Sequence, residues 1–221
     1  SASSRTCVPG CSALPREASI PMPVRLNQAS CGVEPSGTLL VILPGRAMQV
    51  GELEAHGFVQ SVASLRLNVD VLRADAHSGY YRNDTLLERL RIDVIAPARA
   101  AGYTSFWLAG ISLGGLAAVR YANSHPSDVD GLFLIAPYFG SARAAEAIAR
   151  EGGLRHWRAP TVSPLGLTLE TYAWRSLRAL SLKDRDQPPI YLGYGIHDWN
   201  APVVQVLAEA LPASVSGDTT N

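Results

Sequence analysis

Charge of one sign and long hydrophobic runs are both missing from this 221-residue chain. Its 19 basic residues balance 19 acidic ones, which argues against a protein that coats nucleic acid or an anionic membrane, because those partners attract positive charge. No stretch reaches the roughly 20 apolar residues of a membrane-spanning helix. Since 47% of the residues are nevertheless hydrophobic, we expect one well-buried globular domain and no extensive disorder.

Cysteine is absent after residue 31 and occurs only at Cys7, Cys11 and Cys31. The same stretch is rich in proline and serine, so residues 1–37 are expected to form an irregular N-terminal arm together with the first strands. Pairing of Cys7 or Cys11 with Cys31 would pin this arm, and disulfides persist only in oxidising compartments. We therefore expect an exported protein, periplasmic or extracellular, from which any targeting peptide has been removed; an unbridged arm in a cytoplasmic protein is the alternative.

From residue 38 onward, short apolar runs alternate with segments of helical periodicity. Continuous apolar runs bounded by turn residues are typical of strands buried on both faces of a parallel sheet. The predicted strands are Thr38–Leu43, Asn68–Leu72, Ser105–Ala109, Gly131–Ala136 and Pro189–Gly195. Helices are predicted at Val50–Leu65, from Thr85 to a stop at Gly102 with a kink at Pro97, and at Leu113–Asn123, Thr168–Leu182 and Ala201–Leu211; Ala76–Tyr81 is predicted to be a polar loop. This order predicts an α/β fold with a doubly wound, mostly parallel sheet.

The segment from Gly110 to Gly115 (GISLGG) carries the clearest chemical signal. It joins a predicted strand to a predicted helix, and Ser112 has glycine two residues away on both sides. Small neighbours are needed where the strand and helix backbones almost touch, and the helix N-terminus directs N–H groups toward negative charge that forms beside the serine. The pattern is therefore typical of a G-x-S-x-G nucleophile elbow; a glycine-rich turn with an ordinary serine is the alternative.

With this elbow in its strand-turn-helix context, the chain resembles the α/β-hydrolase family from about Thr38 to Leu211. Three further segments contribute to the resemblance: Leu43-Pro44-Gly45-Arg46 is similar to the oxyanion loop, Asp75 to Tyr81 to the loop after the next strand, and Gly195-Ile196-His197-Asp198 to the segment that carries the triad acid. The resemblance implies a hydrolase domain over residues 38–221, with a short cap inserted at about residues 140–167.

The resemblance also implies a role for each matching residue. Ser112 would be the nucleophile, and the backbone N–H groups of Leu113 and Arg46 would form the oxyanion hole, with the Arg46 side chain free to be solvated. Asp198 would orient the catalytic histidine; a carboxylate that caps the next helix is the alternative for this residue. No metal site and no cofactor are expected.

One element of the family pattern is missing, because no histidine follows Asp198. The family places its histidine after an eighth strand, and a serine hydroxyl is a weak nucleophile without an adjacent base. We therefore expect the given chain to lack the last strand and helix, and the natural gene to continue past Asn221 with a strand and a histidine loop; loss of the chemistry is the alternative. His77 and His197 are weaker candidates for a substitute base.

The substrate pocket is expected to involve His77 and Tyr80, after the second predicted strand, and His156 and Trp157, in the cap segment. A packed helical connection without substrate contact is the alternative for that segment. A cap of this length would leave the pocket open and would suit a modest ester rather than a long polymer.

Together these features predict a serine hydrolase that cleaves a carboxylic ester through an acyl-enzyme on Ser112. An acyltransferase or thioesterase would use the same residues, and a non-catalytic binding protein of this fold is the hypothesis favoured by the missing histidine. We expect a small-molecule ester as the partner, no nucleic acid and no integral membrane segment. The strand at Pro189–Gly195 should form a sheet edge through which the chain could self-associate.

Overall fold

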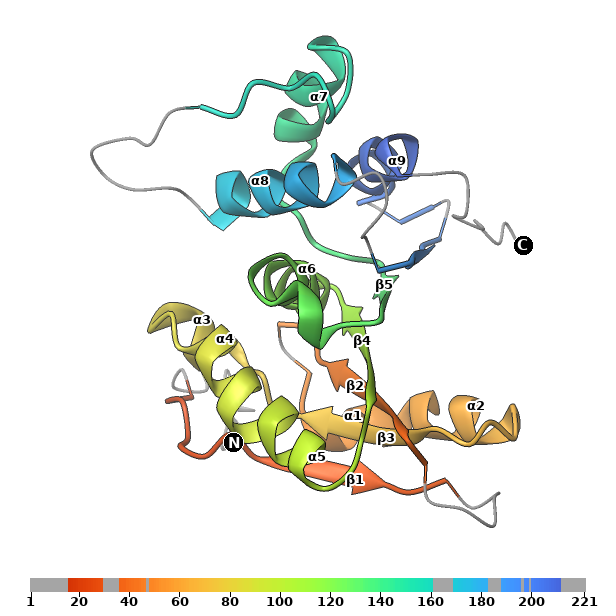
Figure 1. The fold of residues 1–221 in the computed structure, drawn as a ribbon. Coiled ribbons are helices and arrows are strands. Elements are labelled where there is room, and N and C mark those ends of the chain that lie inside the picture. Colours follow the sequence, from red (N-terminus) through yellow and green to blue (C-terminus); the bar gives the residue numbers. More distant parts are fainter. Residues whose placement is uncertain are drawn as a thin grey trace, which may run out of the picture.

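The computed structural model describes residues 16–29, 36–46, 48–160, 169–182, 188–195, 197–198 and 200–211. Within these residues, a six-stranded sheet runs through the molecule with helices on both sides (Figure 1). Its strands are β1 (Val24–Asn27), β2 (Thr38–Leu43), β3 (Asp70–Ala74), β4 (Ser105–Ile111), β5 (Gly131–Ile135) and β6 (Ile190–Gly193). The three cysteines lie outside the described residues, so their pairing stays a prediction.

The strand order is β1-β3-β2-β4-β5-β6, and only β1 pairs antiparallel to its neighbour. The predicted α/β class with a mostly parallel sheet is therefore confirmed, and β6 is the edge strand of the described sheet, as expected. The bounds of β2 are those predicted, whereas β3 begins two residues late and extends to Ala74. The extension follows from pairing with β1, whose Val24 lies opposite Ala74.

Helices connect the strands on both faces of the sheet. They are α1 (Val50–Ala55), α2 (Phe58–Ser64), α3 (Ser78–Arg82), α4 (Leu86–Arg89), the π-helical turn η1 (Leu90–Ile95), α5 (Ala96–Ala100), α6 (Leu113–Ser124), the 3-10 turn η2 (Pro126–Asp128), α7 (Ala142–Arg150), α8 (Leu169–Ser181) and α9 (Ala201–Ala210). In the described part of the chain, no helix combines the length and the apolar character that crossing a membrane would require.

Two local predictions were wrong. The helix predicted at Val50–Leu65 is divided into α1 and α2, because Gly57 adopts a left-handed conformation with φ of 79°. The polar loop predicted at Ala76–Tyr81 contains the start of α3, because the His77 side chain accepts a hydrogen bond from the Gly79 N–H and caps the helix. Neither feature changes the hydrophobic periodicity, which is why the pattern alone missed both.

Where a kink at Pro97 was predicted, the regular α-helix is interrupted by the π-helical turn η1, which ends just before α5. Proline has no N–H, and its ring clashes with the carbonyl group four residues earlier, so a regular α-helix cannot pass through it. The wider π turn absorbs this conflict. Gly102, with φ of 105°, follows the end of α5 as the predicted helix stop.

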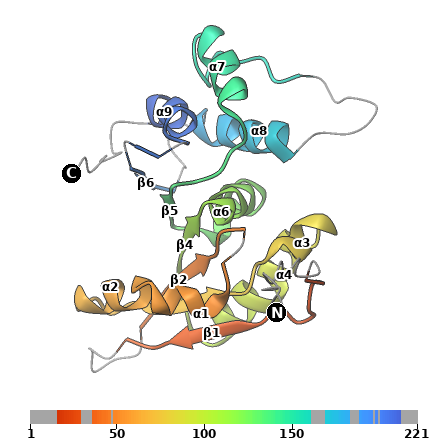
Figure 2. The same cartoon turned by 180° about the vertical axis from the view of Figure 1, so that it is seen from behind.

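The two faces of the sheet are covered unequally. One face packs against α4, α6 and α8 in a large core that includes Leu39, Phe106 and Leu132. The other face forms a smaller cluster in which Leu53 and Phe58, of α1 and α2, meet the sheet. Seen from behind, α1 and α2 lie in front of the β2 and β3 end of the sheet, away from β5 and β6 (Figure 2).

Candidate active site

Ser112 sits on a strained turn between β4 and α6. Its φ of 51° and ψ of −114° place a non-glycine residue in a sparsely populated region of backbone conformation. Strain of this kind persists only where surrounding contacts hold it. Here the Ser112 N–H donates to the Ile135 carbonyl oxygen at 3.0 Å, and the Ser112 carbonyl accepts from the Tyr138 N–H at 2.9 Å. A strained serine between a strand and a helix is the conformation that a nucleophile elbow requires.

Glycines allow the strand and the helix to approach closely around this turn. A β carbon on Gly110 would lie 2.4 Å from the Gly114 carbonyl oxygen, and one on Gly114 would lie 2.2 Å from the Leu43 carbonyl oxygen. A β carbon on Gly115 would lie 2.7 Å from the Pro137 side chain. Real β carbons do not come this close to other atoms, so only glycine fits at these three positions. The glycine spacing therefore has a steric cause, as the sequence suggested.

The predicted oxyanion residues flank Ser112. A β carbon on Gly45 would be 3.5 Å from the Ser112 β carbon, so the loop after β2 passes directly beside the serine. Arg46 follows on that loop with an exposed side chain, and Leu113 is the first residue of α6, where helical N–H groups have no partner within the helix. The structure thus brings both backbones to the serine, and their role in binding an oxyanion stays a prediction.

A relay of hydrogen bonds connects Asp198 to the elbow. The Asp198 Oδ1 accepts from the Asn200 N–H at 3.0 Å, and the Asn200 Nδ2 donates to the Pro137 carbonyl oxygen at 2.5 Å. The next residue, Tyr138, donates its N–H to the Ser112 carbonyl. Asp198 therefore lies at the same carboxyl edge of the sheet as Ser112. Its contact with Asn200, the N-cap of α9, is also the contact expected of a helix-capping carboxylate, and its role as the triad acid stays a prediction.

All five histidines lie in the described residues, and none forms a hydrogen bond with the Ser112 hydroxyl. His77 uses its Nδ1 to accept from the Gly79 N–H at 3.1 Å, and its buried Nε2 has no partner among the described residues. His197 has an exposed side chain beside Asp198. Among the described residues, neither His77 nor His197 is arranged as a substitute base for Ser112.

Tyr80 does not line a pocket. Its side chain is fully buried, with 0% exposure, because its hydroxyl donates to the Ser19 carbonyl at 2.8 Å and accepts from the Ser19 N–H. His77 is buried beside it, with the two ring centroids 4.8 Å apart. Burial, followed by the nearby Arg16 guanidinium, lowers the pKa of His77. Both side chains are buried in the packing beside Ser19, and the contact with substrate that was expected of His77 and Tyr80 stays a prediction.

His156 and Trp157 follow α7, in the connection between β5 and β6. Trp157 is buried in the main core, whereas His156 is exposed and its Nδ1 lies 3.0 Å from the Gly152 carbonyl oxygen. Figure 1 shows α7, α8 and α9 gathered at the β5 and β6 end of the sheet, and α8 packs on α6. A cap over Ser112 stays a prediction, because residues 161–168 are outside the described part of this connection.

Sequence reasoning missed Tyr81, which touches the elbow directly. Its hydroxyl donates to the Leu113 carbonyl oxygen at 3.0 Å. Burial raises the pKa of Tyr81, so the phenol stays protonated and keeps its role as donor. Tyr81 is the last residue of the Asp75–Tyr81 segment that resembles the family pattern. The direction in which its side chain points depends on α3, and the sequence did not predict this helix.

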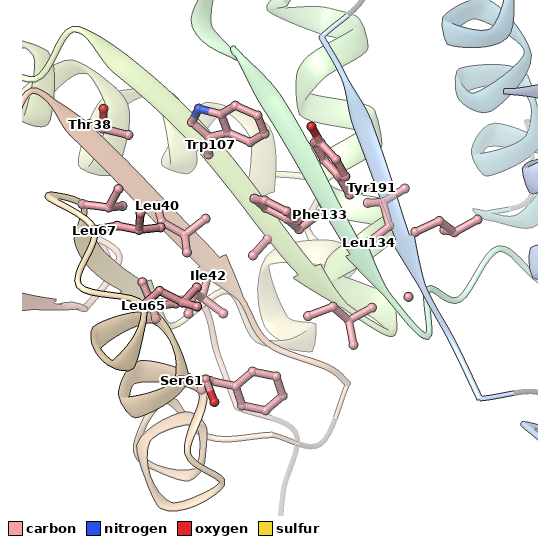
Figure 3. A pocket seen from close by; sticks show the side chains of 17 residues that line it. Thr38, Leu40, Ile42, Ser61, Leu65, Leu67, Trp107, Phe133, Leu134 and Tyr191 are labelled. Atoms are coloured by element: carbon pink, nitrogen blue, oxygen red, sulfur yellow. The ribbon is translucent and has the colours of Figure 1, made fainter. Parts of the chain in front are cut away.

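An apolar groove of about 650 Å³ lies on the sheet face that carries α2 (Figure 3). Its lining comes from β2, β4, β5, β6 and α2, and Ser112 is not part of it. The described residues contain no group of three or more potential metal ligands among histidine, cysteine, aspartate and glutamate.

No family model matches the sequence, and no curated protein matches it. Solved structures do match. Est1E from Butyrivibrio proteoclasticus superposes with a TM-score of 0.60 at 19% identity, over 89% of this chain and 83% of that chain. The monoacylglycerol lipase of Paleococcus ferrophilus gives a TM-score of 0.55 at 16% identity, over 90% and 88%. The S-formylglutathione hydrolase FrmB from Staphylococcus aureus gives 0.58 at 13% identity, over 86% and 75%.

These similarities extend over most of the chain. They show the fold of the chain but no particular activity, because the identities are all below 20%. The chain has the α/β-hydrolase fold.

Proposed function

We propose that the protein is a serine hydrolase that cleaves a small carboxylic ester through an acyl-enzyme on Ser112. The observation that carries the proposal is the strained conformation of Ser112 on a glycine-lined turn at the start of α6. A turn of this kind exposes a serine hydroxyl beside free helical N–H groups, which is the arrangement that acyl transfer needs.

In this mechanism, the Ser112 oxygen attacks the ester carbonyl carbon, and negative charge develops on the carbonyl oxygen. The Leu113 N–H, at the start of the twelve-residue helix α6, and the Arg46 N–H would stabilise that charge. The C–O bond then breaks, the alcohol leaves with a proton, and the acyl group remains on Ser112. Water releases the acid in a second step of the same kind.

Attack requires a group that accepts the Ser112 proton. None of the five histidines is placed to do so, although Asp198 lies at the right edge of the sheet. We propose that Asp198 orients a histidine other than these five. The position of Asp198 supports this role. Hydrogen bonds through Asn200 and Pro137 connect its loop to the segment that holds Ser112.

The neighbours support a small ester as substrate. One structure of Est1E has ferulic acid bound, and another neighbour is a monoacylglycerol lipase. Both names refer to small molecules, and a small-molecule ester is the substrate class that we propose for Ser112.

A fluorophosphonate probe tests the proposal on the intact product of the natural gene. We expect covalent labelling at Ser112, located by peptide mass spectrometry, and none in Ser112→Ala. Asp198→Asn should slow labelling strongly, because it would weaken the orientation of the base. Turnover of p-nitrophenyl acetate, followed with and without added alcohol, separates hydrolysis from acyl transfer.

The absence of an imidazole at Ser112 favours one competing function, a non-catalytic protein that binds esters. That function predicts no labelling of Ser112 in the intact product, no turnover, and unchanged ligand binding in Ser112→Ala. Those three results together would exclude the hydrolase.

A further inference from the structure

Leu113, the first residue of α6, is held through its side chain and its carbonyl group but not through its N–H. The side chain is buried in the main core, with 8% exposure. The carbonyl oxygen accepts a hydrogen bond from the Tyr81 hydroxyl at 3.0 Å. The N–H has no partner among the described residues, as is usual for the first residue of a helix. Leu113 therefore presents one unpaired donor beside Ser112 from a fixed position.

The two peptide groups that flank Leu113 are both fixed by hydrogen bonds from outside α6. A peptide group is planar and trans, so its C=O and its N–H point in opposite directions. In the Ser112–Leu113 peptide, the carbonyl accepts from the Tyr138 N–H at 2.9 Å, and this bond fixes the direction of the Leu113 N–H. In the Leu113–Gly114 peptide, the carbonyl accepts from the Tyr81 hydroxyl. Rotation of either group would turn the backbone at Leu113, so Tyr81 and Tyr138 together restrain its N–H.

The Tyr81 bond adds to the hydrogen bonding of α6 and replaces none of it. A carbonyl oxygen has two lone pairs, and within an α-helix one of them accepts from the N–H four residues later. Loss of the Tyr81 hydroxyl would therefore leave the Leu113 carbonyl with its helical partner and leave the twelve-residue helix intact. The expected consequence is a looser first turn, in which the Leu113 N–H moves more than in the parent protein.

The position of the Tyr81 hydroxyl is fixed by the short helix α3. The His77 Nδ1 accepts from the Gly79 N–H at 3.1 Å and so caps this helix. The Tyr80 hydroxyl, one residue earlier on the helix, donates to the Ser19 carbonyl at 2.8 Å. With α3 anchored in this way, Tyr81 packs its ring against the main core and directs its hydroxyl to the elbow. Burial raises the pKa of Tyr81, so the phenol remains a donor at neutral pH.

We propose that Tyr81 is a positioning residue for the oxyanion hole, which keeps the Leu113 N–H in place while negative charge develops beside Ser112. The inference rests on the proposed hydrolase function, because it needs a reaction that creates such a charge. Donors that are already in place stabilise a developing charge without a cost of reorganisation. In this role Tyr81 acts through the Leu113 peptide and not on the substrate itself.

Steady-state kinetics of the intact product of the natural gene, with p-nitrophenyl acetate, test the proposal. Tyr81→Phe keeps the ring and removes the hydroxyl. Because positioning matters only when charge develops, kcat and kcat/KM should fall together by about tenfold, while KM changes by less than about twofold. Binding of methylboronic acid gives an independent readout, since its adduct with Ser112 carries negative charge as the transition state does. Its affinity should fall by the same factor as kcat/KM.

Tyr103→Phe is the matched control. The Tyr103 hydroxyl donates to the Asp70 Oδ2 at 2.5 Å, at the start of β3 and therefore at the sheet edge opposite Ser112. This variant loses a hydroxyl hydrogen bond of the same kind, so it reports the effect of lost stability alone. It should keep the kinetics of the parent protein and its affinity for methylboronic acid. Urea denaturation verifies that both variants are folded under the assay conditions.

The positioning role is wrong if Tyr81→Phe binds methylboronic acid as tightly as Tyr103→Phe does. A rise in KM with unchanged kcat would also contradict it, because that result indicates a lost contact with the substrate. In both cases an active parent protein leaves the proposed hydrolase function standing. If the parent protein neither turns over the ester nor reacts with a fluorophosphonate at Ser112, the proposed function fails, and the positioning role fails with it.

Discussion

The two faces of the central sheet contrast sharply within single strands. In β5, Leu132 is 0% exposed against the helical core, while the next residue, Phe133, is 37% exposed on the opposite face. Both belong to one continuous apolar run, GLFLI, which is typical of a strand buried on both sides. The difference shows that an apolar run does not by itself settle which face of a strand the rest of the chain covers, because Leu132 is enclosed and Phe133 is partly exposed.

The elbow and the β6 edge differ in the same way. Around Ser112, three glycines, two backbone hydrogen bonds and the Tyr81 hydroxyl fix the chain from every side. At β6, four residues are held by one neighbouring strand within the described sheet. The first region is constrained enough to store backbone strain, whereas the second has fewer described contacts to hold it.

The largest effect is expected where the elbow is tightest. Gly114→Val would place a branched side chain into the Leu43 backbone, so we expect a loss of more than about 3 kcal/mol in the free energy of unfolding, or failure to fold. Urea denaturation measures it. The control is Gly51→Ala in α1, where a β carbon meets nothing within 4 Å and helix propensity should stabilise slightly. Equal stability of the two variants would contradict the close approach.

Truncation of neighbouring residues in β5 tests the difference between the faces directly. Leu132→Ala should cost about 2–5 kcal/mol because it leaves a cavity in the main core. Phe133→Ala, although it removes more atoms, should cost less because its ring is partly solvated. The free energies come from urea titration. A larger cost for Phe133→Ala would show that its face is covered by other parts of the chain.

Removal of the Tyr81 hydroxyl tests how much its hydrogen bond to Leu113 contributes to stability and to the reactivity of Ser112. Tyr81→Phe removes the hydrogen bond to Leu113, and we expect a loss of about 1 kcal/mol in unfolding free energy. Labelling of Ser112 by a fluorophosphonate should also slow. Tyr172→Phe is the matched control, because the Tyr172 ring keeps its contact with Arg120 after the change. If both variants behave alike, the bond to Leu113 contributes nothing.

A smaller effect should come from the pH dependence of His77. Because burial and Arg16 lower its pKa in the fold, the unfolded chain binds the proton more readily. Stability from His77 is therefore complete above the unfolded value of about 6.5 and declines as the pH falls below it. His77→Asn keeps a capping acceptor for α3 but removes the titration. The urea midpoint of this variant should fall less between pH 7.5 and 5.5 than that of the parent chain, whereas exposed His56→Asn should follow the parent.

Several structural features could not be read from the sequence because they depend on distant residues. Tyr80 and Tyr81 are adjacent and chemically alike, yet one is held by Ser19 in the core and the other by Leu113 at the elbow. The break at Gly57 leaves the apolar periodicity intact, so periodicity could not reveal it. The Asn200 side chain donates a hydrogen bond to the Pro137 carbonyl, 63 positions earlier in the chain. No local sequence pattern predicts a contact over that separation.

The sequence by itself determined the alternation of strands and helices, the mostly parallel sheet and the elbow at Ser112. These features are local, since they follow from apolar runs, from periodicity and from glycines two residues away from a serine. Only the tertiary structure decided which face of each strand is covered and which histidines stay away from Ser112. Those outcomes depend on how distant segments pack, because burial and the direction of a strand edge are properties of the whole sheet and not of any one segment.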